Sequence, residues 1–140
     1  MKHILLSIIA AVSTHAALAA EVPFTISNIE TTEGSLVVAL HPSDEAWPKP
    51  PKNALILTVK PKAGSVSGVF HNVADGEYAM SVMQDIDNDG KLKIGFLGSP
   101  KEPYGVSGNK LSAMSAPKYD EAKFIVKGNV ATVVMNLEQP

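Results

Sequence analysis

The sequence predicts an all-β protein, an antiparallel β-sandwich of about seven strands. Short segments that alternate apolar and polar residues, or are rich in β-branched residues, recur along residues 20–140. Pro, Gly, Asn and Asp separate these segments, as they separate the strands of sandwich proteins. No helical periodicity of useful length occurs in this part of the sequence. We therefore expect strands joined by turns and loops.

The first two strands are expected at residues 24–29 and 36–40. The first segment alternates apolar and polar residues, so one face of its strand should be buried. The second is a short apolar run, and the turn at Glu33-Gly34 separates the two. Several prolines surround Trp47 in residues 42–52, which predicts an irregular, extended loop.

Three more strands are expected in the middle of the chain. Residues 54–59 end shortly before Pro61, residues 65–70 have a weaker strand pattern, and residues 78–83 have a strong one. The turn between the last two lies at Asp75-Gly76. At the start of the last strand, Tyr78 is expected to pack in the core with its hydroxyl bonded to nearby backbone.

The C-terminal part is less regular. Residues 84–121 are rich in Gly, Pro, Lys, Asp and Ser, which predicts a long ordered loop with a short turn of helix around residues 117–122. Residues 122–126 and 130–137 follow, joined by a turn at Lys127-Gly128-Asn129. This pattern predicts a terminal β-hairpin.

Residues 1–19 have the pattern of a secretory signal peptide. Lys2 gives a positive start, residues 4–12 are almost all apolar, and Ala17-Leu18-Ala19 predicts cleavage after Ala19. The apolar run is shorter than the roughly 20 residues that span a bilayer. We expect a secreted protein, periplasmic in a Gram-negative bacterium, with residues 20–140 as a single domain. No stable membrane insertion is expected after the signal is removed.

The composition excludes several classes of function. All 12 basic residues other than His are Lys, they are outnumbered by 14 acidic residues, and Cys is absent. Arginine clamps, thiolate chemistry and disulfides are therefore excluded, and we expect no binding to nucleic acid. Neither a serine nucleophile elbow nor a phosphate-binding loop occurs. We assign no catalytic residue and no organic cofactor.

The segment Asp85-Ile86-Asp87-Asn88-Asp89-Gly90 is the strongest candidate site. Its three carboxylates stand at alternate positions after a predicted strand, so a tightly curled loop can direct them to one point. A hard cation such as Ca²⁺ would relieve their mutual repulsion. Gly90 stands where such loops turn sharply.

The EF-hand template indicates which further ligands a cation would need. The three Asp fit positions one, three and five, and the backbone carbonyl of Lys91 could serve at position seven. Phe96 stands where the template has a bidentate Glu, so the missing carboxylate must come from Glu102, Asp120 or Glu121. We predict a metal site, with Ca²⁺ preferred over Mg²⁺ or Zn²⁺, at Asp85, Asp87, Asp89, Lys91 and Glu102. The alternative is a solvated acidic turn that needs no ion.

The chain resembles a family of secreted bacterial proteins known only as domain of unknown function family 2141. Three segments carry the resemblance: Gly76-Glu77-Tyr78-Ala79, Asp85-x-Asp87-x-Asp89-Gly90-Lys91-Leu92 and Leu97-Gly98-x-Pro100-Lys101-Glu102-x-Tyr104-Gly105-x-Ser107. The resemblance covers essentially all of residues 20–140. It implies an exported, all-β single domain of transthyretin-like or immunoglobulin-like shape with no established activity. In that family the acidic loop often continues with another Asp, whereas this chain has Leu92-Lys93-Ile94.

Three other side chains could have a function. Trp47 is expected to cap the core, although a tryptophan in a proline-rich loop could also stack on a sugar or a partner. His41 and His71 are expected to be isolated surface residues. The alternative is that one of them pairs with Asp44 or Asp75.

We therefore interpret the chain as an exported binding or accessory module without catalytic activity. A cation at the acidic loop would order residues 90–107 into a surface that contacts a partner protein or an envelope polymer. The first alternative is a metal-dependent hydrolase that acts on a cell-envelope component, with a carboxylate as base. The second is a purely structural domain in which the acidic turn has no role.

Overall fold

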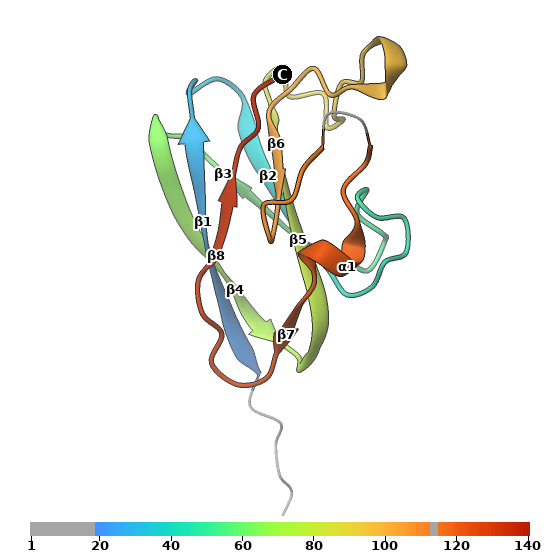
Figure 1. The fold of residues 1–140 in the computed structure, drawn as a ribbon. Coiled ribbons are helices and arrows are strands. Elements are labelled where there is room, and N and C mark those ends of the chain that lie inside the picture. Colours follow the sequence, from blue (N-terminus) through green and yellow to red (C-terminus); the bar gives the residue numbers. More distant parts are fainter. Residues whose placement is uncertain (1–18, 113–114) are drawn as a thin grey trace, which may run out of the picture.

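The structure is a computed structural model that describes residues 19–112 and 115–140, apart from the side chain of Leu97. Two β-sheets of three and five strands pack face to face (Figure 1). This architecture confirms the predicted all-β sandwich. Nearly all of the predicted signal peptide, residues 1–19, lies outside the described residues, so export stays a prediction.

The smaller sheet has the strand order β4-β1-β8. Its central strand β1 (Ala20–Ile29) is antiparallel to β4 (Gly64–Val73) and parallel to β8 (Val133–Asn136). All other pairs among the described strands are antiparallel.

The larger sheet has the order β3-β2-β5-β6. Its strands are β3 (Leu55–Val59), β2 (Ser35–His41), β5 (Gly76–Asp85) and β6 (Tyr104–Val106). A further strand, β7 (Phe124–Val126), pairs with the first residues of β5, and β6 pairs with later residues of β5. The strand β5 is therefore central to this sheet.

The C-terminal part differs from its prediction in three strands, β6, β7 and β8 (Val133–Asn136). The predicted terminal hairpin is wrong, because β7 joins the larger sheet and β8 joins the smaller one. This crossing buries Val126 and Met135 completely in the shared core, which a free hairpin would not do. The short strand β6 was not predicted within residues 84–121. The expected turn of helix is present as α1 (Tyr119–Ala122), and a 3-10 helix, η1, spans Phe96–Gly98.

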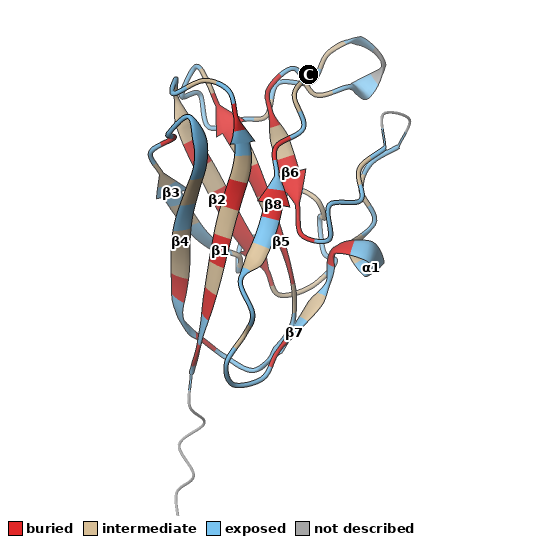
Figure 2. Cartoon of the chain, turned by 60° about the vertical axis from the view of Figure 1, so that its left-hand side comes forward, coloured by how far each residue is buried: buried red, intermediate tan, exposed pale blue. Residues whose placement is uncertain are grey.

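The core lies between the sheets and consists of alternate residues of the strands. In β1, Val22, Phe24 and Ile26 are fully buried, and the residues between them are only partly buried (Figure 2). The other strands contribute Leu36, Val38, Leu40, Phe70, Val73, Met80, Val82 and Met135. As predicted, Tyr78 packs against this core and donates a hydrogen bond from its hydroxyl to the carbonyl of Ala74 at 2.8 Å.

The turn between β1 and β2 packs against the end of β5, so a larger residue at Gly34 should destabilise the fold. Gly34 has a φ of +71°, and a Cβ at this position would lie 2.0 Å from the backbone oxygen of Asp85. Gly128 has a similar φ of +68°, with nothing within 4 Å of its Cβ position. Both Ala substitutions strain the backbone, but only Gly34→Ala adds a clash. Urea denaturation should show that Gly34→Ala loses about 1–3 kcal/mol more than Gly128→Ala; equal losses would contradict the described contact.

Candidate functional site

The acidic loop begins at Asp85, the last residue of β5, and the carboxylate of this residue closes the loop. Asp85 is only 3% exposed. Its Oδ1 accepts a hydrogen bond from the N–H of Asp89 at 3.1 Å, and its Oδ2 accepts one from the N–H of Gly90 at 2.8 Å. A buried carboxylate needs such donors because an unpaired buried charge is costly. Asp85 therefore holds the curl of the loop.

Asp87 and Asp89 hold the outer part of the loop. Asp87 accepts a hydrogen bond from the N–H of Asp89 at 3.4 Å, and Asp89 accepts one from the N–H of Lys91 at 2.9 Å. The ammonium of Lys93 forms an ion pair with the second oxygen of Asp87. The hydrogen bond from Lys93 lowers the pKa of Asp87, and the same contact raises the pKa of Lys93. Both groups are therefore charged at neutral pH.

Glu102 ties the two ends of the loop together. It is 3% exposed and lies before β6. Its Oε1 accepts a hydrogen bond from the N–H of Ile86 at 3.1 Å, and its Oε2 accepts one from the N–H of Lys93 at 3.0 Å. The carboxylate thus joins residues 86 and 93 to the segment that leads into the sheet.

Among the described residues, Asp85, Asp87 and Asp89 form a group that could hold a metal ion. Each offers a carboxylate oxygen, and these oxygens lie within 4.8 Å of one another. Glu102 lies beside the loop but is not in this group, and Lys91 contributes its N–H rather than its carbonyl to the hydrogen bonds described above. The alternative prediction, an acidic turn that binds no ion, would be held by these same hydrogen bonds. The two remaining carboxylate candidates, Asp120 and Glu121, lie on α1 outside the group.

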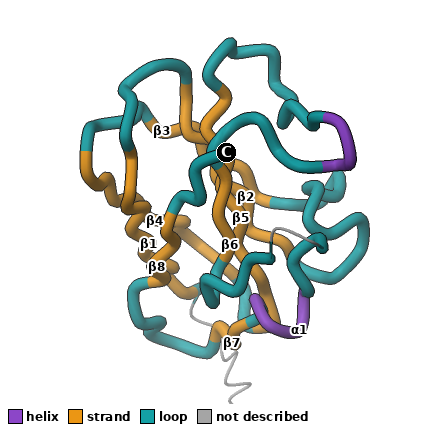
Figure 3. Tube along the Cα trace, turned by 45° about the horizontal axis from the view of Figure 1, so that its top comes forward, coloured by secondary structure: helices purple, strands orange, loops and turns teal. Residues whose placement is uncertain are grey.

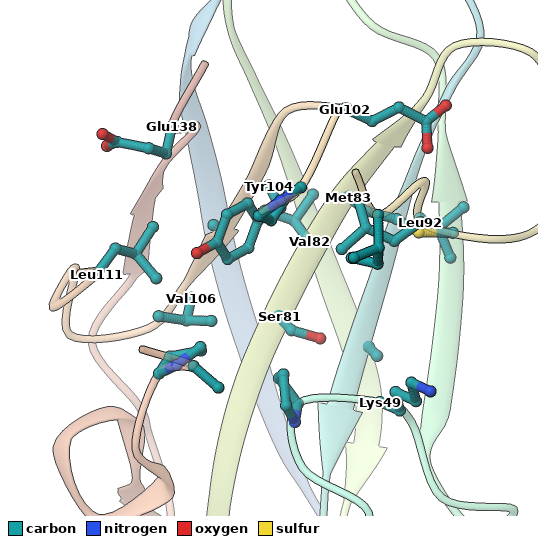
Figure 4. Close-up of a pocket in the computed structure, with 18 of the residues that line it drawn as sticks. Lys49, Ser81, Val82, Met83, Leu92, Glu102, Tyr104, Val106, Leu111 and Glu138 are labelled. Carbon is teal, nitrogen blue, oxygen red and sulfur yellow. The ribbon is translucent and has the colours of Figure 1, made fainter. Parts of the chain in front are cut away.

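A cleft of about 1120 Å³ lies on the outer face of the larger sheet (Figure 4). Inward residues of β2 and β5 fill the core, so the residues between them face the opposite side. The pairing of the strands places these outward residues side by side. They form two rows: Val37, Met83 and Tyr104 in one, and Ile56, Ala39, Ser81 and Val106 in the other. The floor is therefore apolar except for Ser81 and the hydroxyl of Tyr104.

The walls of the cleft come from loops that are distant in sequence. Viewed from the top, these loops extend on the side of the larger sheet that is opposite β1, β4 and β8 (Figure 3). One wall follows the acidic loop and includes residues 90–92 and 98–100. Others are formed by residues 48–50, by residues 115–117 and by residues 138–140. The acidic loop and Glu102 therefore position one side of the cleft.

His41 lies at the end of β2, on the same outer face as the floor of the cleft, and is fully buried. Its Nε2 is 2.8 Å from the hydroxyl oxygen of Ser81, and its Nδ1 has no hydrogen-bond partner among the described residues. Burial lowers the pKa of His41 to about 4. The ring centres of Trp47 and His41 are 4.7 Å apart in a T-shaped arrangement, and the indole N–H donates to the carbonyl of Pro117 at 2.8 Å. Trp47 therefore caps a small second core, as predicted.

The prediction of a surface position is wrong for His41, because Trp47 covers it. His71 is exposed as predicted, and it pairs with Glu21 at 2.7 Å rather than with Asp44 or Asp75. The contact between Ser81 and His41 was not predicted. It resembles a nucleophile with its base, but an imidazole whose pKa is far below neutral is a weak acceptor for a serine proton. The pair is better suited to presenting a hydrogen bond in the cleft.

The family described as "Uncharacterized protein conserved in bacteria (DUF2141)" matches residues 24–134. The chain belongs to this family. The match includes the last six residues of β1, all of β2 to β7, the acidic loop, the cleft floor and most of the cleft walls. It confirms the predicted resemblance. Neither the curated proteins nor the solved structures contain a match to this chain.

Helices in the described part of the chain are all too short or too polar to cross a membrane.

His41 should make the free energy of unfolding depend on pH. Its pKa is about 4 in the folded protein, compared with the ordinary value of 6.5 that applies in the unfolded chain. Between these values the unfolded chain binds a proton that the folded protein does not, so this group makes stability decrease as the pH falls from 6.5 to 4. The loss from this one group is about 3 kcal/mol at pH 4. Urea denaturation at pH 7, 5.5 and 4 measures this loss. Between pH 7 and pH 4 the free energy of unfolding of the wild type should fall by this amount more than that of His41→Gln. Parallel pH profiles of the two proteins would contradict a buried neutral His41.

Proposed function

We propose that the protein is an exported, non-catalytic binding module and that its binding site is the cleft on the outer face of the larger sheet. The observation that carries the proposal is the apolar floor formed by outward residues of four neighbouring strands. The outer face of a sandwich is usually polar when it faces water. An apolar outer face that is walled by loops therefore supports a binding site.

The size and lining of the cleft support an apolar ligand, or the apolar segment of an envelope component. Ligand sites typically have volumes of about 300–1,000 Å³ and are lined mainly by apolar side chains with a few polar groups. At about 1120 Å³ the cleft is slightly larger than this range. Ile56 and Ile94 line it and remain 48% and 54% exposed, so a ligand would remove apolar surface from water.

In this proposal the acidic loop holds one wall of the cleft, and Ca²⁺ strengthens that support. An ion bound by Asp85, Asp87 and Asp89 would replace the ammonium of Lys93 at Asp87 and hold residues 90–92 more firmly. Because each ionised carboxylate has several lone pairs, the hydrogen bonds to the loop backbone leave room for a metal ligand. Extracellular Ca²⁺ modules work with dissociation constants of about 10⁻⁴–10⁻³ M, so weak binding would suffice for an exported protein.

The cleft is tested with Nile red, an uncharged apolar dye whose fluorescence rises on binding. Val37→Trp should fill the floor and reduce dye binding at least about tenfold, because the indole occupies space that the ligand needs. Val134 is a valine on β8 of the smaller sheet, is 48% exposed, and does not line the cleft. Val134→Trp is therefore the matched control and should bind the dye like the wild type, with circular dichroism verifying that both variants fold. Wild-type protein that binds no dye, or equal binding by both variants, would contradict the proposed site.

The role of Ca²⁺ is tested by calorimetric titration of residues 20–140, with melting curves recorded in parallel. Lys93→Gln removes the ammonium that competes for Asp87, so it should bind Ca²⁺ several-fold more tightly than the wild type. Asp87→Asn should lose the signal, and Lys110→Gln, which changes an exposed lysine outside the acidic loop, should behave like the wild type. If neither the wild type nor Lys93→Gln shows saturable binding up to millimolar Ca²⁺, the loop is an acidic turn held by hydrogen bonds alone.

A further inference from the structure

The cleft is lined by two lysines that make no ion pair among the described residues, and their charge favours an anionic ligand. Lys49 and Lys91 both line the cleft. Within the described part of the chain neither makes an ion pair, whereas Lys93 and Lys123 do. Two ammonium groups without a carboxylate partner therefore border an apolar floor.

The two carboxylates that line the cleft do not balance these lysines. Both oxygens of Glu102 accept hydrogen bonds from loop backbone, and its side chain is buried. Glu138 lies on the far side of β5 from Lys49, together with Tyr104 (Figure 4). Glu138 and Lys49 therefore line opposite sides of the cleft, and Lys91 belongs to the acidic-loop wall.

The hydroxyl of Ser81 adds a hydrogen-bond donor in the floor. If Nε2 of His41 accepted the Ser81 proton, Nδ1 would carry a buried N–H without a partner among the described residues. Orphaned buried N–H groups are rarer than unsatisfied acceptors. The favoured tautomer therefore donates from Nε2 to Ser81, and the Ser81 hydrogen is free to point into the cleft. Cations and this donor both complement a ligand that carries acceptor oxygens.

Taking these observations together, and building on the function proposed above, we propose that the cleft binds a long-chain carboxylate. Its hydrocarbon chain lies across the outer faces of β2, β5 and β6, and its carboxylate lies within reach of a lysine that lines the cleft, Lys49 or Lys91. A long-chain carboxylate combines the anionic group that these lysines complement with the apolar chain that the floor complements. The absence of arginine fits this assignment, because single lysine contacts suffice for a carboxylate.

The test displaces Nile red from the full-length mature domain with three ligands of equal chain length, all kept below their micelle concentrations: palmitate, hexadecanol and hexadecyltrimethylammonium. Palmitate should displace the dye at least about fivefold more effectively than hexadecanol, because a partly exposed charge contact favours it. The cationic ligand should be the weakest of the three. In the double variant Lys49→Ala/Lys91→Ala, palmitate should fall to the level of hexadecanol while hexadecanol is unchanged.

The matched control, Lys52→Ala/Lys110→Ala, removes two exposed lysines that do not line the cleft and should leave the preference for palmitate intact. Equal displacement by all three ligands, or stronger displacement by diacyl phosphatidylglycerol than by palmitate, would overturn this inference and leave the proposed cleft standing. A wild-type protein that binds no Nile red would instead overturn the proposed function itself. The two failures are therefore distinguishable.

Discussion

The pairing of β5 with three neighbouring strands is the constraint on which both the core and the cleft depend. β2 pairs with seven residues of β5, and β6 and β7 share its other edge. Because side chains alternate along a strand, Met80 and Val82 enter the core while Ser81 and Met83 face the cleft. A shift of register by one residue would exchange the two sets and destroy both surfaces. The same register therefore determines both the core and the floor of the cleft.

The acidic loop depends on the same strand, since Asp85 is the last residue of β5. Two buried carboxylates, those of Asp85 and Glu102, together accept four backbone hydrogen bonds and hold the loop against the sheet. The exposed carboxylates of Asp87 and Asp89 are less constrained, and Lys93 already neutralises one of them. The buried acids thus have a structural role, whereas the exposed acids offer the part of the loop that an ion could change. A change in this loop would be transmitted to residues 90–92 in the wall of the cleft.

Local patterns in the sequence predicted most of the strands, because alternation and turn residues act over short distances. The pattern of residues 24–29, for example, matches the buried face of β1. The converging Asp side chains also followed from their alternate spacing. The same reasoning missed β6, whose three residues include Gly105, and it misassigned β7 and β8 to a hairpin because their partners lie about 50 and 110 residues earlier.

The cleft could not be predicted for a similar reason. β2 carries apolar residues on both faces, with Val37 and Ala39 alternating with Leu36 and Val38, and such a run indicates burial on two sides. It does not indicate which part of the chain covers the second side. The covering loops come from residues 48–50, 90–100 and 138–140, and only the folded chain brings them together. His41 was placed on the surface because its cover, Trp47, belongs to one of these loops.

The most direct test of the proposed binding cleft is to locate a bound ligand. Nuclear Overhauser effects between the chain protons of the ligand and the methyl groups of the protein would do so. Contacts are expected with Val37, Ile56 and Val106, which line the cleft on the outer face of the larger sheet. Contacts confined to exposed apolar residues elsewhere, such as Ile125 and Val134, would contradict the proposed cleft.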